Sequence, residues 1–216
     1  MFKPRRTIKL LPSNSLRKTG EVDHADWNYR FVLGYIQRKR FLLILKLLGN
    51  SRYDNLLEIG YGSGVFIPQL AEYSQNIFGI DIHNKNESIM KTLLKYHIKS
   101  NLFSASVEEM PFGSNFFDAL ISVSALEFVE NLDAACMEIK RVLKKDGNLF
   151  VVTPGYSKIL DFGLKVLTGK NAQDDYGDKR QRMIPALSRH FKIKREIVFP
   201  IINFGIKIYT AFQLTM

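Results

Sequence analysis

The sequence predicts an α/β fold built on a doubly wound and mostly parallel sheet. Short apolar runs alternate with amphipathic stretches between residues 53 and 154, a pattern typical of βαβ units whose sheet is covered on both faces. Two segments rich in Ile, Val, Phe and Tyr, 191–200 and 204–214, follow as an expected pair of terminal strands, with an antiparallel strand at the end of the chain. The 216 residues suit one domain with modest extensions.

The alternation assigns the elements in chain order. Apolar residues of 26–48 recur at helical spacing, so we expect one or two helices that end at Gly49-Asn50. The runs expected to form strands are 55–59, 76–82, 101–107, 117–123 and 149–153. The stretches expected to form helices are 65–73, 87–98 and 132–143. A looser, charged region follows Pro154-Gly155 and continues to about Arg189.

Composition excludes several classes of protein. Cys136 is the only cysteine, so a disulfide within the chain and a thiolate metal cluster are both excluded, and nothing else implies a metal. Its place in the apolar pattern of 132–143 predicts a packed helix residue. The first residues lack the apolar core of a signal peptide, and no apolar run approaches the roughly 20 residues of a membrane helix. We therefore expect a cytoplasmic protein.

The net charge of +10 is unevenly placed. Residues 1–50 carry a net +8, residues 51–150 a net −4 and residues 151–216 a net +6. Local potential steers association, so an anionic partner would meet the two basic flanks rather than the acidic middle. The same distribution also fits a solvated surface with a basic bias.

A glycine-rich turn is the strongest local signal. The expected strand 55–59 runs into Gly60, Gly62 and Gly64 and then into an expected helix. Glycines permit close ligand approach, and the start of a helix presents unpaired N–H groups. Asp81 ends the next expected strand, about 20 residues later, where a carboxylate can accept both hydroxyls of a ribose. The pair predicts a nucleoside-containing cofactor.

The residue before the turn distinguishes between nucleosides. Dinucleotide sites show G-x-G-x-x-G, whereas this turn has a glycine at every second position and Glu58 before it. A carboxylate facing the turn opposes a pyrophosphate and favours an ammonium or sulfonium group. The electrostatics therefore favour S-adenosyl-L-methionine.

Five ordered motifs between residues 53 and 154 carry a family resemblance. They are Leu57-Glu58-Ile59-Gly60-Tyr61-Gly62-Ser63-Gly64, Gly79-Ile80-Asp81, Glu108-Glu109-Met110-Pro111-Phe112 with Asn115-Phe116-Phe117-Asp118, Ala125-Leu126-Glu127-Phe128-Val129, and Ile139-Lys140-Arg141-Val142-Leu143-Lys144-Lys145-Asp146-Gly147. With them the chain resembles class I S-adenosylmethionine-dependent methyltransferases, especially the ubiquinone and menaquinone biosynthesis branch. The resemblance implies a Rossmann-like sheet of seven strands and transfer of a methyl group.

The resemblance also implies the cofactor-binding residues. Glu58, Gly60, Gly62 and Gly64 would line the methionine part, together with Ser124 after the fourth strand. Asp81 would bind the ribose, and Ser106 and Val107 the adenine. Many members have an acid at position 106, so the serine implies that backbone and apolar contacts hold the adenine here.

Methyl transfer needs alignment more than a base. If the acceptor is a hydroxyl, phenol or enol, Glu127 and His24 are the candidate bases. Glu127 is also explained, more simply, as a loop or helix-cap acid, and His24 as an ordinary surface residue. Many members place a His after that acid; this chain has Phe128, so a His base at that position is excluded.

The change of pattern near residue 50 divides the chain into an expected helical extension, 1–50, and an expected methyltransferase domain, 51–216, in which 155–190 is expected to be a substrate-side insertion. The extension is interpreted either as a lid or as aromatic residues packed on the sheet. We expect a small-molecule or lipid-like methyl acceptor. Basic residues near the carboxyl end, including Lys192, Lys194 and Lys207, suit peripheral contact with anionic lipid, although strands facing a core explain them too.

Two alternatives stay open. Basic flanks also suit an RNA methyltransferase, although no RNA-binding motif accompanies them. A non-catalytic module that keeps the fold is the second alternative.

Overall fold

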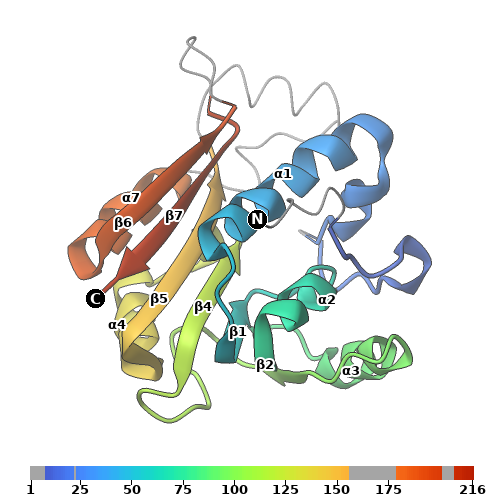
Figure 1. The fold of residues 1–216 in the computed structure, drawn as a ribbon, viewed down its shortest axis with the longest axis horizontal. Coiled ribbons are helices and arrows are strands. Elements are labelled where there is room, and N and C mark those ends of the chain that lie inside the picture. Colours follow the sequence, from blue (N-terminus) through green and yellow to red (C-terminus); the bar gives the residue numbers. More distant parts are fainter. Residues whose placement is uncertain (1–7, 22, 156–178, 201–206) are drawn as a thin grey trace.

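A computed structural model describes residues 8–21, 23–155, 179–200 and 207–216, and its centre is a seven-stranded sheet (Figure 1). The strand order is β3-β2-β1-β4-β5-β7-β6. The first five strands in this order, β3, β2, β1, β4 and β5, pair in parallel. In contrast, β7 is antiparallel to both β5 and β6. The strands are β1 Tyr53–Ile59, β2 Ser74–Asp81, β3 Asn101–Ser104, β4 Phe117–Val123, β5 Leu143–Pro154, β6 Lys192–Phe199 and β7 Tyr209–Thr215. The expected doubly wound α/β fold is confirmed.

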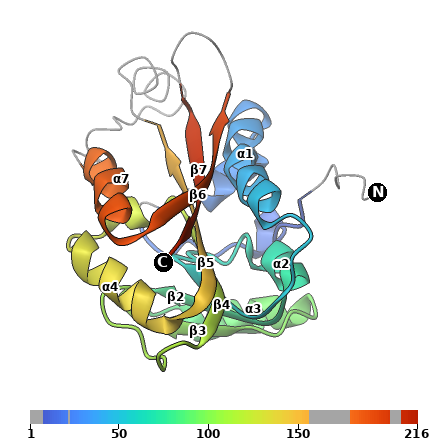
Figure 2. The same cartoon turned by 60° about the vertical axis from the view of Figure 1, so that its left-hand side comes forward.

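Helices cover both faces of this sheet, as Figure 2 shows. One face carries α1, α2 and α3, and the other carries α4 and α7. Successive strand residues point to opposite faces, so Leu56 packs in the first core and Leu57 in the second. The helices are α1 Phe31–Leu48, α2 Ile67–Leu70, α3 Asn86–Lys95, α4 Leu132–Val142 and α7 Lys179–His190, with short 3-10 turns η1 Ser13–Ser15, η2 Ala25–Tyr29, η3 Ala71–Tyr73 and η4 Leu126–Phe128.

The segment before the sheet forms η2 and α1, in agreement with the expected one or two helices. Gly49 ends α1 with φ +60° and donates its N–H to the Leu45 carbonyl. The link from Gly49 to Tyr53 is short, so the end of α1 lies at the edge where the parallel strands begin. Its start therefore lies near the carboxyl edge, where those strands end.

The largest differences from the sequence prediction concern β3, β5 and α7. β3 ends at Ser104 rather than at residue 107, because the chain turns there and Val107 packs in the second core. β5 begins at Leu143 rather than at residue 149, because the polar residues up to Gly147 do not have the apolar pattern of a buried strand. The register between β4 and β5 shifts within this stretch. The third difference is α7, which forms where we expected a looser region.

Buried Met183 and Leu187 explain α7, because they lie four residues apart on one helical face and join the second core. Asp133 of α4 also accepts hydrogen bonds from Arg189 at 2.9 Å and is 2.7 Å from His190. Of the expected substrate-side insertion, residues 156–178 lie outside the described residues, as does the start of the expected strand 204–214. Within the described part, no helix is long and apolar enough to cross a bilayer.

Candidate functional site

The glycine turn after β1 has a backbone that only glycine adopts easily. Gly60, Gly62 and Gly64 have φ of 73°, 51° and 72°. A Cβ on Gly60 would lie 2.3 Å from the Cβ of Ala125, in the loop after β4. The turns after β1 and β4 therefore touch. The strand order reverses between these two strands, and ligands of open α/β sheets bind at such a point.

Asp81 ends β2 beside this turn, as expected. Its Oδ2 accepts the Gly62 N–H at 2.8 Å, and its Oδ1 accepts the His83 N–H at 3.4 Å. Two residues separated by 19 positions are thus joined directly. One edge of the sheet holds a carboxylate against the glycine turn.

Glu58, the next-to-last residue of β1, is buried behind the turn, with 3% of its surface exposed. Its Oε2 has no hydrogen-bond partner in the described structure. Burial raises the pKa of Glu58 well above its usual value, the nearby Asp81 raises it further, and Arg40 of α1 opposes both. A buried carboxyl with an unused oxygen is suited to a cationic ligand group.

The loop after β4 carries two of the expected residues. Ser124 has a left-handed backbone, φ 54°, and donates its N–H to the Val152 carbonyl at 2.9 Å. Its buried Oγ has no partner in the described part of the chain. Glu127 lies in η4 and is fully buried. Glu127 and Arg40 act on the pKa of Tyr209, which burial raises, so these three residues of η4, α1 and β7 lie near one another.

The expected adenine-side residues follow β3. Ser106 Oγ lies 3.2 Å from Glu108 Oε2 and accepts the Glu108 N–H at 3.2 Å. Val107 is buried. The turn is anchored beside β2 because the Ala105 N–H donates to the Asp81 carbonyl at 2.9 Å. Many members of the family have an acid at position 106. In this chain Ser106 stands at that position, and the acid Glu108 contacts it.

Sequence reasoning missed His83 and Tyr61. His83 Nε2 lies 2.9 Å from the Gly62 carbonyl, and its Nδ1 lies 3.1 Å from the Lys85 N–H. A carbonyl can only accept, so Nε2 carries the proton and Nδ1 accepts. The Tyr61 ring packs edge-on to His83 at 4.9 Å. A Cβ on Gly79 would lie 2.8 Å from this ring. The position of His83 two residues after Asp81 was the available signal.

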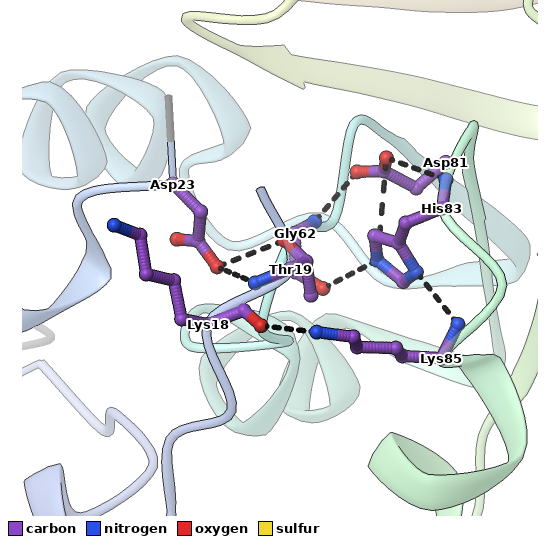
Figure 3. A network of polar contacts seen from close by, with 7 residues as sticks. All are labelled: Lys18, Thr19, Asp23, Gly62, Asp81, His83 and Lys85. Carbon is purple, nitrogen blue, oxygen red and sulfur yellow. Dashed lines mark hydrogen bonds and ion pairs between the residues drawn. The ribbon is translucent and has the colours of Figure 1, made fainter. Parts of the chain in front are cut away.

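The segment before α1 also reaches the glycine turn (Figure 3). The Lys85 ammonium donates to the Lys18 carbonyl at 2.7 Å. Asp23 accepts from the Thr19 N–H at 3.0 Å, and its Oδ1 would lie 3.8 Å from a Cβ on Gly62. We call residues 8–21 and 23–30 the N-terminal strap. His24 of the strap stacks on Trp27 with ring centroids 4.1 Å apart, rather than standing free on the surface.

Comparison with known proteins agrees with this geometry. Residues 57–151 match the family described as "Methyltransferase domain". This part of the chain is therefore similar to methyltransferase domains. The match spans the glycine turn, Asp81 and Glu127, so the resemblance to class I methyltransferases is confirmed.

The individual relatives have low sequence identity to this chain. The chain is 32% identical over 144 residues to the biotin biosynthesis bifunctional protein BioHC of Saccharophagus degradans, covering 66% of this chain and 25% of that protein. It is 24% identical over 190 residues to the ubiquinone/menaquinone biosynthesis C-methyltransferase UbiE of Rickettsia bellii, covering 74% and 77%. A geranyl diphosphate C-methyltransferase from Streptomyces coelicolor, solved with Mg²⁺, geranyl diphosphate and S-adenosyl-L-homocysteine, superposes with a TM-score of 0.66 at 12% identity, covering 91% of this chain and 86% of that one. At 12% identity this last likeness concerns the fold alone.

Proposed function

We propose that the chain is an S-adenosyl-L-methionine-dependent methyltransferase that acts on a small-molecule or lipid-like acceptor. The observation that carries the proposal is the buried Glu58 carboxyl with an unused oxygen, next to a glycine turn whose Gly62 N–H donates to Asp81. Matching relatives named as quinone-biosynthesis methyltransferases support it.

The residues fit this cofactor chemically. Glu58 would pair with the ammonium of the methionine part, and Gly60, Gly62 and Gly64 leave room for it, with Ser124 on the opposite side. The Asp81 carboxylate would accept hydrogen bonds from the ribose hydroxyls in place of the hydrogen bond from the Gly62 N–H. Ser106 and Val107 would lie against the adenine.

The cofactor supplies a methyl group on a sulfonium that is already a good leaving group. The protein then has to align the acceptor with that methyl, and alignment can supply several kcal/mol, up to about 7–11. The Glu58 carboxylate would also fix the methionine part. Closure of the N-terminal strap against the Gly62 turn would exclude water, which is the lid role proposed for residues 1–50.

A base contributes only if the acceptor must lose a proton. Glu127 and His24 stay the candidates. Glu127 is fully buried, and both it and Arg40 act on the pKa of Tyr209, so a cation lies near this candidate base. His24 is only partly buried, and its stacking on Trp27 orients the ring.

Calorimetric titration with S-adenosyl-L-homocysteine tests the proposal. Wild type should bind in the micromolar range, and Asp81→Ala should weaken binding by about tenfold or more, since it removes charge-assisted hydrogen bonds worth roughly 1.5–3 kcal/mol. Asp146→Ala, at an exposed position on β5, is the matched control and should bind as wild type does. A preference for NAD in a parallel titration would contradict the proposal.

Turnover separates the remaining alternatives. Formation of S-adenosyl-L-homocysteine with phenol, quinol and prenyl acceptors, lost in Asp81→Ala, would distinguish an enzyme from a binding module. Glu127→Gln and His24→Ala should reduce kcat only for acceptors that must lose a proton. Salt-sensitive RNA binding would favour the RNA methyltransferase instead.

A further inference from the structure

The first turns of α1 expose apolar residues on the side that faces away from the sheet. Phe31 is 97% exposed, Tyr35 57% and Val32 53%. The same turns bury Leu33 and Gly34 on the inner side. Other exposed large apolar residues of the described chain occur one or two to an element, so α1 carries the densest group. Contiguous exposed apolar side chains mark an interaction site more often than scattered ones do.

Cations accompany this group. Between Arg30 and Leu48 the chain has five Lys and Arg and no Asp or Glu. The Lys39 ammonium lies 4.3 Å from the Tyr35 ring centroid and 5.3 Å from that of Phe199 on β6. We call Phe31, Val32, Tyr35 and Lys39 the α1 face. The nearby acid Asp26 is paired with Arg30 at 3.0 Å, so the surroundings of the α1 face stay positive.

We propose that the α1 face docks the protein on the surface of an anionic lipid bilayer. Aromatic and aliphatic side chains on one side of a helix enter the region between headgroups and acyl chains, while lysines stay at headgroup level. An absence of acids over nineteen residues complements anionic headgroups. This inference does not depend on the proposed methyl transfer.

The α1 face lies on the same side of the protein as the candidate site. The start of α1 lies near the carboxyl edge of the sheet, where the glycine turn and Glu127 also lie. A bilayer against the α1 face would therefore stand on the side of the protein that holds the candidate site. An acceptor dissolved in the bilayer would have a short route to that site.

Co-sedimentation with vesicles tests the proposal. Wild type should bind phosphatidylcholine vesicles that contain phosphatidylglycerol and should bind pure phosphatidylcholine much more weakly. Phe31→Ser combined with Tyr35→Ser should reduce the partition coefficient at least tenfold, because two aromatic side chains no longer enter the region between headgroups and acyl chains. Lys39→Gln should reduce it about fivefold, and added salt should remove that difference.

Controls keep the test independent of folding and catalysis. Met137→Ser changes a side chain that is 65% exposed on α4 and should leave partition unchanged. Because Phe31 and Tyr35 are exposed, the double variant should keep the Tm and the S-adenosyl-L-homocysteine affinity of wild type. Equal binding to both kinds of vesicle, an equal loss in Met137→Ser, or no loss in the double variant would overturn the proposal. A different result would also overturn it: wild type forms a dimer in solution, the double variant does not, and wild type binds no vesicles. The α1 face would then join two copies of the chain.

Discussion

Replacement of Gly60 by Ala tests whether contact between the turns after β1 and β4 is as tight as the structure has it. At φ 73° an alanine costs about 1–2 kcal/mol. The new Cβ would also lie 2.3 Å from the Ala125 Cβ, and both turns belong to the packed end of the sheet. Overpacking of this kind costs about 1–3 kcal/mol. Alanine also lowers the conformational entropy of the unfolded chain, which offsets part of these two costs. We therefore expect Gly60→Ala to lower the free energy of unfolding by roughly 2–4 kcal/mol.

Two other glycines separate the contributions. Gly49→Ala, at φ +60° with open space around it, should cost only the backbone strain, about 1 kcal/mol. Gly113→Ala, exposed and without a positive φ, should change the free energy by no more than about 0.5 kcal/mol. Urea unfolding followed by circular dichroism measures all three.

Ligand binding completes this test. Displacement of the glycine turn should abolish calorimetric binding of S-adenosyl-L-homocysteine by Gly60→Ala, while Gly49→Ala binds normally. If Gly60→Ala were no less stable than Gly49→Ala and bound the ligand equally well, the two turns would have room to separate. The turns after β1 and β4 would then not be in the close contact that the structure has.

Three further predictions concern charge and hydrogen bonding. Glu58 has a pKa raised by burial, so wild type should lose stability relative to Glu58→Gln as pH rises above 4.5, as urea unfolding at several pH values would show; a constant difference would contradict this. His83→Ala removes the ring between the Gly62 carbonyl and the Lys85 N–H and should weaken S-adenosyl-L-homocysteine binding about tenfold in calorimetry, whereas an unchanged affinity would exclude the ring from shaping the turn. The pKa of Asp118 is lowered, despite its burial, by hydrogen bonds from the Asn55 N–H and Lys144, so Asp118→Asn should cost about 1–2 kcal/mol at neutral pH. That cost should disappear as pH falls below 3.8, and its persistence in acid would argue against the charge.

Local patterns were sufficient for much of the fold. Strands β1, β2 and β4 and helices α3 and α4 lie where the alternation predicts them, because buried parallel strands are nearly continuous apolar runs. Polar Lys144 and Asp146 interrupted that signal at the start of β5. Cys136 packs in α4 with 1% exposure, and burial raises its pKa to about 11, in agreement with a packed helix residue.

For the candidate site, sequence by itself determined which residues end or follow each strand: Glu58 near the end of β1 and the glycines after it, Asp81 at the end of β2, and Glu127 after β4. Strand ends are local, and parallel pairing brings such ends to one edge. Only the tertiary structure placed Arg40, His83 and the N-terminal strap there. Their contacts join positions far apart in the chain, such as Lys18 with Lys85, and no periodicity along the sequence encodes such a pairing. The exposure of Phe31 is likewise a property of the fold, because an apolar residue at helical spacing could have faced either side of α1.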